Sequence, residues 1–178
     1  MRFELQRWAD AHRDGFAAML GDPEVMADQG GPIDRDVSMA RFDAYRDAWD
    51  VDGISRWVVA DPTGGFLGYV GVSRRADADH PLGVHHEIGW RLCRHAWGRG
   101  LATESACMAL AHAWTVLEAA EILAYTAAEN QRSQCVMGRL SFRRDSARDF
   151  VRSSAAGGRM VLLWCLNRPD APDLLAST

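Results

Sequence analysis

The sequence predicts one α/β domain spanning residues 1–178, and three observations support this fold class. A chain of 178 residues with 48% hydrophobic and 25% charged residues has the size and composition of a single soluble domain. Residues 87–117 change from a period of two to helical spacings across a glycine-rich turn, which indicates a strand followed by a helix. Segments of both kinds alternate along the rest of the chain, so helices are expected to pack on a sheet.

The N-terminal part is expected to form a strand and two helices. Residues 3–8 predict the strand, and Asp10 is the expected N-cap of a short helix that buries Phe16, Met19 and Leu20. Gly30-Gly31-Pro32 then interrupts the pattern. Asp34 is expected to cap the second helix, whose apolar face contains Phe42, Tyr45 and Trp49.

The central part is expected to form a hairpin, a loop and the strand–turn–helix unit. Residues 56–60 and 66–73 are apolar runs separated by Asp61-Pro62-Thr63-Gly64-Gly65, which is typical of a hairpin turn. The polar residues 74–83 predict a loop. In the strand that follows, Ile88, Trp90 and Leu92 share one face, opposite Glu87. Helical spacing resumes at Ala102 and continues to Leu117.

The C-terminal part is expected to add strands around one more helix. Residues 122–126 predict a short strand, and residues 130–140 predict a helix that begins with polar side chains. Residues 142–144 and 160–166 predict the last strands. The segment between them contains Ser153-Ser154 and Gly157-Gly158 and is expected to be mobile.

Composition excludes several classes of function. The formal charge of −4 argues against a nucleic-acid partner, and no apolar run reaches the roughly 20 residues that a membrane helix needs. Arg2, Glu4 and Arg7 argue against a signal peptide. The cysteines are widely spaced and form no CxxC pair, so neither a zinc site nor a disulfide framework is indicated. We therefore expect a reduced, cytoplasmic protein that binds no metal, nucleic acid or membrane.

The turn Trp97-Gly98-Arg99-Gly100 predicts an anion-binding site. Two glycines between a strand and a helix permit positive φ angles and close backbone approach. The free N–H groups and the positive end of the helix dipole then face the turn, an arrangement that suits a phosphate or pyrophosphate. A P-loop is excluded because the chain contains no lysine, and the third glycine of a dinucleotide-binding fingerprint is missing.

The segment from His95 to Gly100 resembles the pyrophosphate loop of the GNAT (Gcn5-related) N-acetyltransferases, Gln/Arg-x-x-Gly-x-Gly/Ala, with histidine in the first position. Glu87-Ile88-Gly89-Trp90, the segment from Asn130 to Met137 and Asp22-Pro23-Glu24-Val25-Met26 extend the resemblance over roughly residues 2–167. They resemble the branch that acetylates the N-termini of ribosomal proteins. The resemblance implies a mixed, mostly antiparallel, twisted sheet of about six to seven strands with helices on both faces.

The same resemblance implies that acetyl-CoA is the co-substrate and lies between two splayed strands, the one that carries Glu87 and residues 122–126. Main-chain groups of three residues would pair with pantetheine, the turn and helix start would hold the pyrophosphate, and the start of the next helix would contact pantetheine and the thioester. The implied cofactor-binding residues are Leu92, Cys93, Arg94, Trp97, Gly98, Arg99, Gly100, Leu101, Ala102, Thr103, Asn130 and Ser133.

Glu87 is the leading candidate for the general base, because it lies on the strand face where the resemblance places the acceptor amine. A carboxylate beside a half-buried strand could have a raised pKa and take a proton directly or through a water. A structural or substrate-orienting carboxylate is the alternative. His85 shares the parity of Glu87 and is the next candidate, whereas His86 faces the other way. No third ligand stands at metal spacing.

Ser133 is the second candidate catalytic residue, placed by the resemblance near the thioester sulfur. Many relatives carry a tyrosine acid seven residues after the asparagine, but this chain has Met137 there. Either Ser133 donates a proton or the thiolate leaves unassisted. Leu140-Ser141-Phe142 also replaces the common Leu-Gly-Phe of the family.

The function implied is an acetyl-CoA-dependent N-acetyltransferase. It would acetylate a primary amine, either a protein N-terminus or a small molecule, by direct attack in a ternary complex. The alternative is a non-catalytic acyl-CoA-binding or regulatory module. A homodimer is a possible assembly. Residues 23–49 and 74–86, which would shape the acceptor pocket, carry no recognisable specificity pattern.

Overall fold

Strands and helices alternate along the computed structural model, which describes residues 2–154 and 157–168. The elements in these ranges are β1 Glu4–Gln6, α1 Arg13–Leu20, α2 Arg35–Val51, β2 Arg56–Ala60, β3 Phe66–Arg75, β4 His85–Leu92, α3 Leu101–Val116, β5 Glu121–Ala127, α4 Gln131–Arg139, β6 Arg143–Arg144, β7 Phe150–Ser154 and β8 Gly157–Asn167. Short 3-10 turns at Asp10–His12, Ala27–Gln29, Arg94–Ala96 and Ser146–Arg148 connect some of them.

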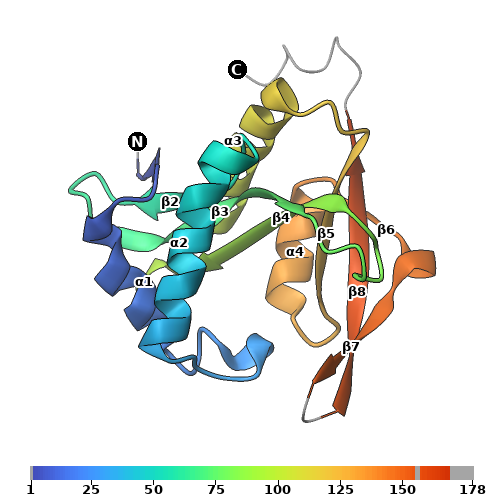
Figure 1. Ribbon diagram of the computed structural model, residues 1–178, viewed down its shortest axis with the longest axis horizontal. Helices are drawn as coiled ribbons and strands as arrows, with labels where there is room; N and C mark the ends of the chain where they lie inside the picture. Colours follow the sequence, from blue (N-terminus) through green and yellow to red (C-terminus); the bar gives the residue numbers. More distant parts are fainter. Residues whose placement is uncertain (1, 155–156, 169–178) are drawn as a thin grey trace.

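One sheet of eight strands forms the centre of the molecule, in the order β1-β2-β3-β4-β5-β8-β6, with β7 also paired to β8 (Figure 1). Every neighbouring pair is antiparallel except β4 and β5, which are parallel. These two strands pair only at Glu87 and Leu123. Beyond this point they diverge, so the predicted splayed strand pair is confirmed.

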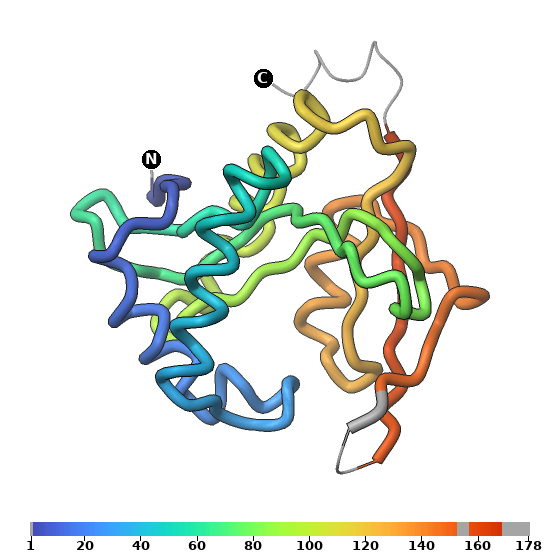
Figure 2. Tube along the Cα trace, viewed as in Figure 1, coloured from blue at the N-terminus to red at the C-terminus, as the bar shows by residue number. Residues whose placement is uncertain are grey.

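Helices cover both faces of the sheet, as the traces in Figures 1 and 2 show. Alternating side chains of β2 and β3 explain the two layers, because successive strand residues point to opposite faces. Val58 and Tyr69 pack under α1 and α2 with Phe16 and Phe42. On the opposite face, apolar strand residues pack under α3 with Ala106, Ala109 and Leu110, and these strand residues include Val59, Val70 and Ile88. Glu87 therefore lies on the α1–α2 face.

Most predicted elements form within a few residues of their expected bounds, and two expectations are corrected. Asp10 does not cap α1, because it begins a 3-10 turn after Ala9 and the α-helix starts at Arg13. The sheet has eight strands rather than six to seven. The extra strand is β7, which lies in the segment expected to be mobile. Its backbone pairs with β8 from Phe150 to Ser154, and this pairing compensates for its polar composition.

Ser141 adopts the backbone conformation that glycine provides in related sequences. Its φ is 62°, and it is the one non-glycine residue with positive φ in the described part of the chain. A side chain in this left-handed region costs roughly 1–2 kcal/mol, so the tight turn between α4 and β6 forms despite the serine. No helix among residues 2–154 and 157–168 is long and apolar enough to span a bilayer.

Candidate active site

The turn that the sequence predicts to bind an anion, here called the cradle, lies where the 3-10 turn after β4 meets the start of α3. Gly98 and Gly100 have φ angles of 72° and 77°, which only glycine adopts readily. The N–H groups of Thr103 and Glu104 both bond to the Gly100 carbonyl. The N–H groups from Gly98 to Ala102 have no hydrogen-bond partner within the described ranges. A row of free donors at the positive end of a helix can bind an anion.

Arginine side chains surround the cradle, and one of them was not expected from the sequence. Arg94 pairs with Glu24 at 2.9 Å, whereas Arg99 is exposed and has no carboxylate partner in the described part of the chain. Arg132, in the first turn of α4, lies over the Trp97 ring with 4.6 Å between its guanidinium carbon and the ring centroid. This contact brings α4 against the turn that precedes α3.

Some main-chain groups between β4 and the cradle already make hydrogen bonds within the protein. The Leu92 carbonyl accepts a bond from Trp97 Nε1 at 2.8 Å, and the Cys93 N–H donates to the Leu67 carbonyl at 2.9 Å. Burial raises the pKa of the Cys93 thiol to about 11, so this side chain is not a ready nucleophile. Main-chain contacts from Leu92, Cys93 and Arg94 to pantetheine stay a prediction.

Glu87 lies at the point where β4 and β5 separate, and two arginines bind it. Its carboxylate is 4% exposed, with Oε1 at 2.7 Å from Arg56 Nη2 and 2.6 Å from Arg75 Nη2. Burial by itself raises the pKa of Glu87, but Arg56, Arg75 and Tyr125 outweigh it and leave the pKa below its ordinary value. The raised pKa expected from the sequence is therefore wrong. Opposite charges that come from two other strands are the cause.

A cluster of rings lies beside Glu87 on the same face. His85 contacts His80 and Tyr125, with ring centroids 4.9 and 5.8 Å apart, and Phe150 of β7 packs against Tyr125 at 5.6 Å. His85 Nδ1 lies 2.7 Å from the Gly83 carbonyl. Its other nitrogen, Nε2, is buried and has no hydrogen-bond partner within the described residues.

At the start of α4, Asn130 is the N-cap of the helix. Its Oδ1 accepts a bond from the Ser133 N–H at 3.1 Å, and its Nδ2 donates to Asp28 Oδ2 at 2.8 Å. Ser133 is half-buried, and its hydroxyl makes no hydrogen bond within the described ranges. Met137 is 2% exposed and belongs to the core under α3. At the position where the resemblance predicts a tyrosine, the chain therefore has a methionine packed in the core.

Asp28 is a residue that sequence reasoning missed. Its carboxylate binds Arg91 of β4 at 3.0 Å and Asn130 before α4, and its carbonyl accepts a bond from Arg159 of β8 at 2.6 Å. We call these three contacts the Asp28 bridge. The bridge links the two sides of the splayed strand pair. No local pattern identifies it, because its partners are 63 to 131 residues away in the sequence.

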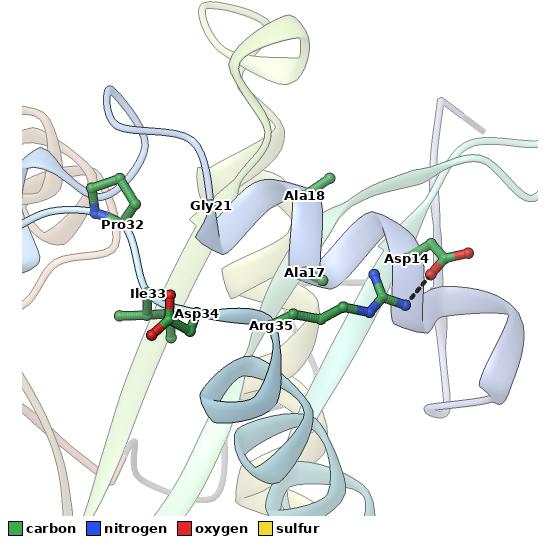
Figure 3. A pocket seen from close by; sticks show the side chains of 8 residues that line it. All are labelled: Asp14, Ala17, Ala18, Gly21, Pro32, Ile33, Asp34 and Arg35. Carbon is green, nitrogen blue, oxygen red and sulfur yellow. Dashed lines mark hydrogen bonds and ion pairs between the residues drawn. The ribbon is translucent and has the colours of Figure 1, made fainter.

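The surface pocket drawn in Figure 3 is separate from this site. It has a volume of about 450 Å³ and lies between the end of α1 and the start of α2, where Ala17, Gly21 and Ile33 contribute to its wall and Asp14 pairs with Arg35. None of the cradle or Glu87 residues lines it. Within residues 2–154 and 157–168, no group of three or more His, Cys, Asp or Glu side chains is arranged to hold a metal ion.

Comparison with known proteins places this geometry in a family. A model described as an acetyltransferase (GNAT) domain matches residues 2–143. An acetyltransferase from Agrobacterium tumefaciens str. C58 is 23% identical, with a TM-score of 0.77 over 93% of this chain and 91% of the other. Spermidine N-acetyltransferase from Vibrio cholerae, solved with CoA and spermine, is 15% identical, with a TM-score of 0.73 and coverage of 94% and 96%. Ribosomal-protein-S5-alanine acetyltransferase from Vibrio fischeri is 12% identical, with a TM-score of 0.75 and coverage of 96% and 95%.

Proposed function

The chain belongs to the GNAT acetyltransferase family, and on that basis we propose that it transfers the acetyl group of acetyl-CoA to a primary amine. The observation that carries the proposal is the cradle. The N–H groups from Gly98 to Ala102 are free at the start of α3, next to the end of β4, where an anion could accept their hydrogen bonds. A pyrophosphate bound there would direct the rest of the cofactor along the splayed edge of β4, toward Glu87.

The residues present fit this cofactor. The free N–H groups from Gly98 to Ala102 would hold the pyrophosphate, and Arg99 is free to add a side-chain contact, whereas the N–H groups of Trp97 and Thr103 are already bonded within the chain. Pantetheine would lie between β4 and β5, where their pairing ends after Glu87. Asn130 and Ser133 lie at the start of α4, which contacts β5 and, through Arg132, the turn before α3. Acetyl-CoA supplies the activated acyl group, and the protein positions it.

The acceptor amine must lose a proton before it attacks. A peptide α-amine has an ordinary pKa of about 7.7–8.0 and a lysine amine about 10.4, so an α-amine needs a weaker base. Arg56 and Arg75 lower the pKa of Glu87 and keep the carboxylate ionised at neutral pH, where both arginines bind it. A lowered pKa also weakens a carboxylate as a proton acceptor. Its role as base stays a prediction.

Departure of the thiolate needs little help from the protein. An unperturbed thiol has a pKa of about 8.5, so the CoA thiolate is a tolerable leaving group. Ser133 is the candidate proton donor, since its hydroxyl makes no internal hydrogen bond in the described chain. Met137 supplies no proton from its buried position. We propose that Ser133 assists and is not essential.

A non-catalytic acyl-CoA-binding module is the second candidate. The observation that favours it is the combination of Met137 in the tyrosine position with a Glu87 carboxylate that two arginines already bind. Such a protein would keep the cradle and bind CoA without turnover.

The test is release of the CoA thiol from acetyl-CoA across a panel of amines. The panel includes polyamines and peptides with N-terminal alanine, because the similar structures include a spermidine N-acetyltransferase and an S5-alanine acetyltransferase. Amine-dependent release above the hydrolysis rate is expected for at least one acceptor. Calorimetric CoA binding without release on any amine would favour the module, and absence of CoA binding would contradict both candidates.

A further inference from the structure

We propose that His85, through its Nε2 atom, is the general base that takes the proton from the acceptor amine. The inference rests on the proposed acetyl transfer and assigns one step of it. The first observation concerns the tautomer of the ring. His85 Nδ1 lies 2.7 Å from the Gly83 carbonyl, and a carbonyl oxygen can only accept a hydrogen bond. The neutral ring must therefore carry its proton on Nδ1, which leaves the lone pair on Nε2.

The second observation concerns the surroundings of Nε2. This atom is buried and makes no hydrogen bond within the described residues, which is uncommon for a buried polar atom. His112 Nε2 is also buried without a partner, but it lies beside Trp57 and Trp49. His85 instead shares the strand face of Glu87, two residues away, at the point where β4 and β5 separate. Location at the site distinguishes His85 from His112.

The third observation is that the competing base is already bound. Both Arg56 and Arg75 contact Glu87 Oε1, and a carboxylate held in two ion pairs gains less from accepting a proton. The two arginines already neutralise the Glu87 charge, so His85 is left as the base that removes the proton of the acceptor.

Every proton that moves in the proposed step is accounted for. His85 Nε2 takes a proton from the ammonium group, and the neutral amine nitrogen bonds to the thioester carbon. The C–S bond then breaks, and the CoA thiolate takes up the second proton that the nitrogen loses on becoming an amide. His85 returns its own proton to solvent. The rings of His80 and Tyr125 limit the access of solvent to the imidazole.

Two substitutions at His85 distinguish loss of the basic nitrogen from loss of the hydrogen bond that the ring makes. His85→Asn keeps an amide N–H near the position of Nδ1 for the Gly83 carbonyl, and His85→Gln extends an amide toward the position of Nε2. Neither amide is basic. His112→Gln is the matched control, because His112 Nε2 is also buried without a partner in the described residues but lies beside Trp49 and Trp57.

The measurement is kcat at saturating acetyl-CoA as a function of pH, with the best amine of the panel. Both His85 variants are expected to lose about 10²–10⁴ in kcat and to lose the limb of the profile in which the wild type needs a deprotonated group, with CoA affinity unchanged. His112→Gln keeps the wild-type rate and profile. The charged or titratable groups around the His85 ring are Arg75, His80, Glu87, Glu121, Tyr125 and Arg152.

A wild-type rate or an unchanged pH profile in either folded His85 variant would overturn the assignment. A second test uses His85→Ala with added imidazole, which can replace the missing base. Rescue of the rate in His85→Ala by imidazole supports the base, and failure of rescue in a variant that binds CoA overturns it. Absence of transfer by the wild type to any amine would instead remove the proposed function itself.

Discussion

At Gly98 and Gly100 the backbone itself is the functional group. Both residues have positive φ, and the N–H groups from Gly98 to Ala102 are free of partners in the described chain at the start of α3. Because the two glycines and the helix start are adjacent in the chain, their spacing alone predicted this turn, and anion binding by it stays a prediction. The electrostatics of Glu87 could not be predicted in the same way. Its partners Arg56 and Arg75 come from two other strands, and only the folded sheet brings them to one carboxylate.

Replacement of Gly100 by valine is expected to abolish CoA binding. A Cβ at this position would lie 3.4 Å from Glu104 Oε1, and a β-branched residue at a φ of 77° is strained. The turn must therefore rearrange, and its donors no longer converge. Gly53→Val is the matched control, because Gly53 has a similar φ of 69° and lies outside the cradle. Titration calorimetry with CoA is the measurement, and wild-type affinity in Gly100→Val would contradict the cradle.

Removal of the Ser133 hydroxyl is expected to lower kcat about tenfold, which corresponds to about 1.4 kcal/mol of barrier. The modest size follows from the leaving group, since a CoA thiolate departs without obligatory protonation. Ser146→Ala, an exposed serine outside the site, serves as the control. The measurement is the steady-state kcat of both variants with one identified amine. A loss of more than about a thousandfold with CoA binding intact would show that Ser133 is an essential acid.

Among the elements, the parallel pair β4–β5 has the shortest backbone pairing in the sheet. Backbone pairing there is limited to Glu87 and Leu123, whereas β5 and β8 pair along seven residues from Glu121 to Ala127. Periodicity predicted both strands, but the extent of their pairing is a tertiary property. The same limit explains the missed β7, whose pairing with β8 is not encoded in its own composition. The Asp28 bridge, from the loop between α1 and α2, adds side-chain contacts across this strand pair.

Loss of the side-chain contacts of the Asp28 bridge is expected to destabilise the protein by about 1–3 kcal/mol, because Asp28→Ala leaves the Arg91 guanidinium without its carboxylate. The Asp28 carbonyl, which Arg159 contacts, is kept. Arg91 is 12% exposed and Asp28 24% exposed, so solvent screens this ion pair only partly. Asp50→Ala removes an exposed aspartate of α2 that has no ion-pair partner in the described chain. Urea unfolding of both variants provides the comparison. Equal stability of the two would show that the bridge carries no net energy.

For the molecule as a whole, four histidines and Glu87 act in the same direction on stability as the pH falls below neutral. Burial lowers the pKa of His12, His80, His86 and His112, and the arginines around Glu87 lower its pKa against the effect of burial. A lowered pKa means that the unfolded chain binds the proton more tightly than the folded one. The stabilising contribution is complete above the unfolded pKa, about 6.5 for histidine and about 4.3 for glutamate, and is lost as the pH falls toward the folded value.

Thermal stability is therefore expected to be constant from pH 8 to about pH 7, to decline below about pH 6.5, and to fall more steeply below about pH 4.3. His12 gives a specific test, because its Nδ1 accepts a bond from the Ala9 N–H at 3.1 Å and loses this ability when protonated. His12→Asn retains an acceptor that does not titrate, so its unfolding midpoint should decline less between pH 7 and pH 5. His95→Asn, an exposed control, should follow the wild type. A wild-type midpoint that stayed constant down to pH 4 would contradict the linkage, and a decline in His12→Asn equal to that of the wild type would remove His12 from it.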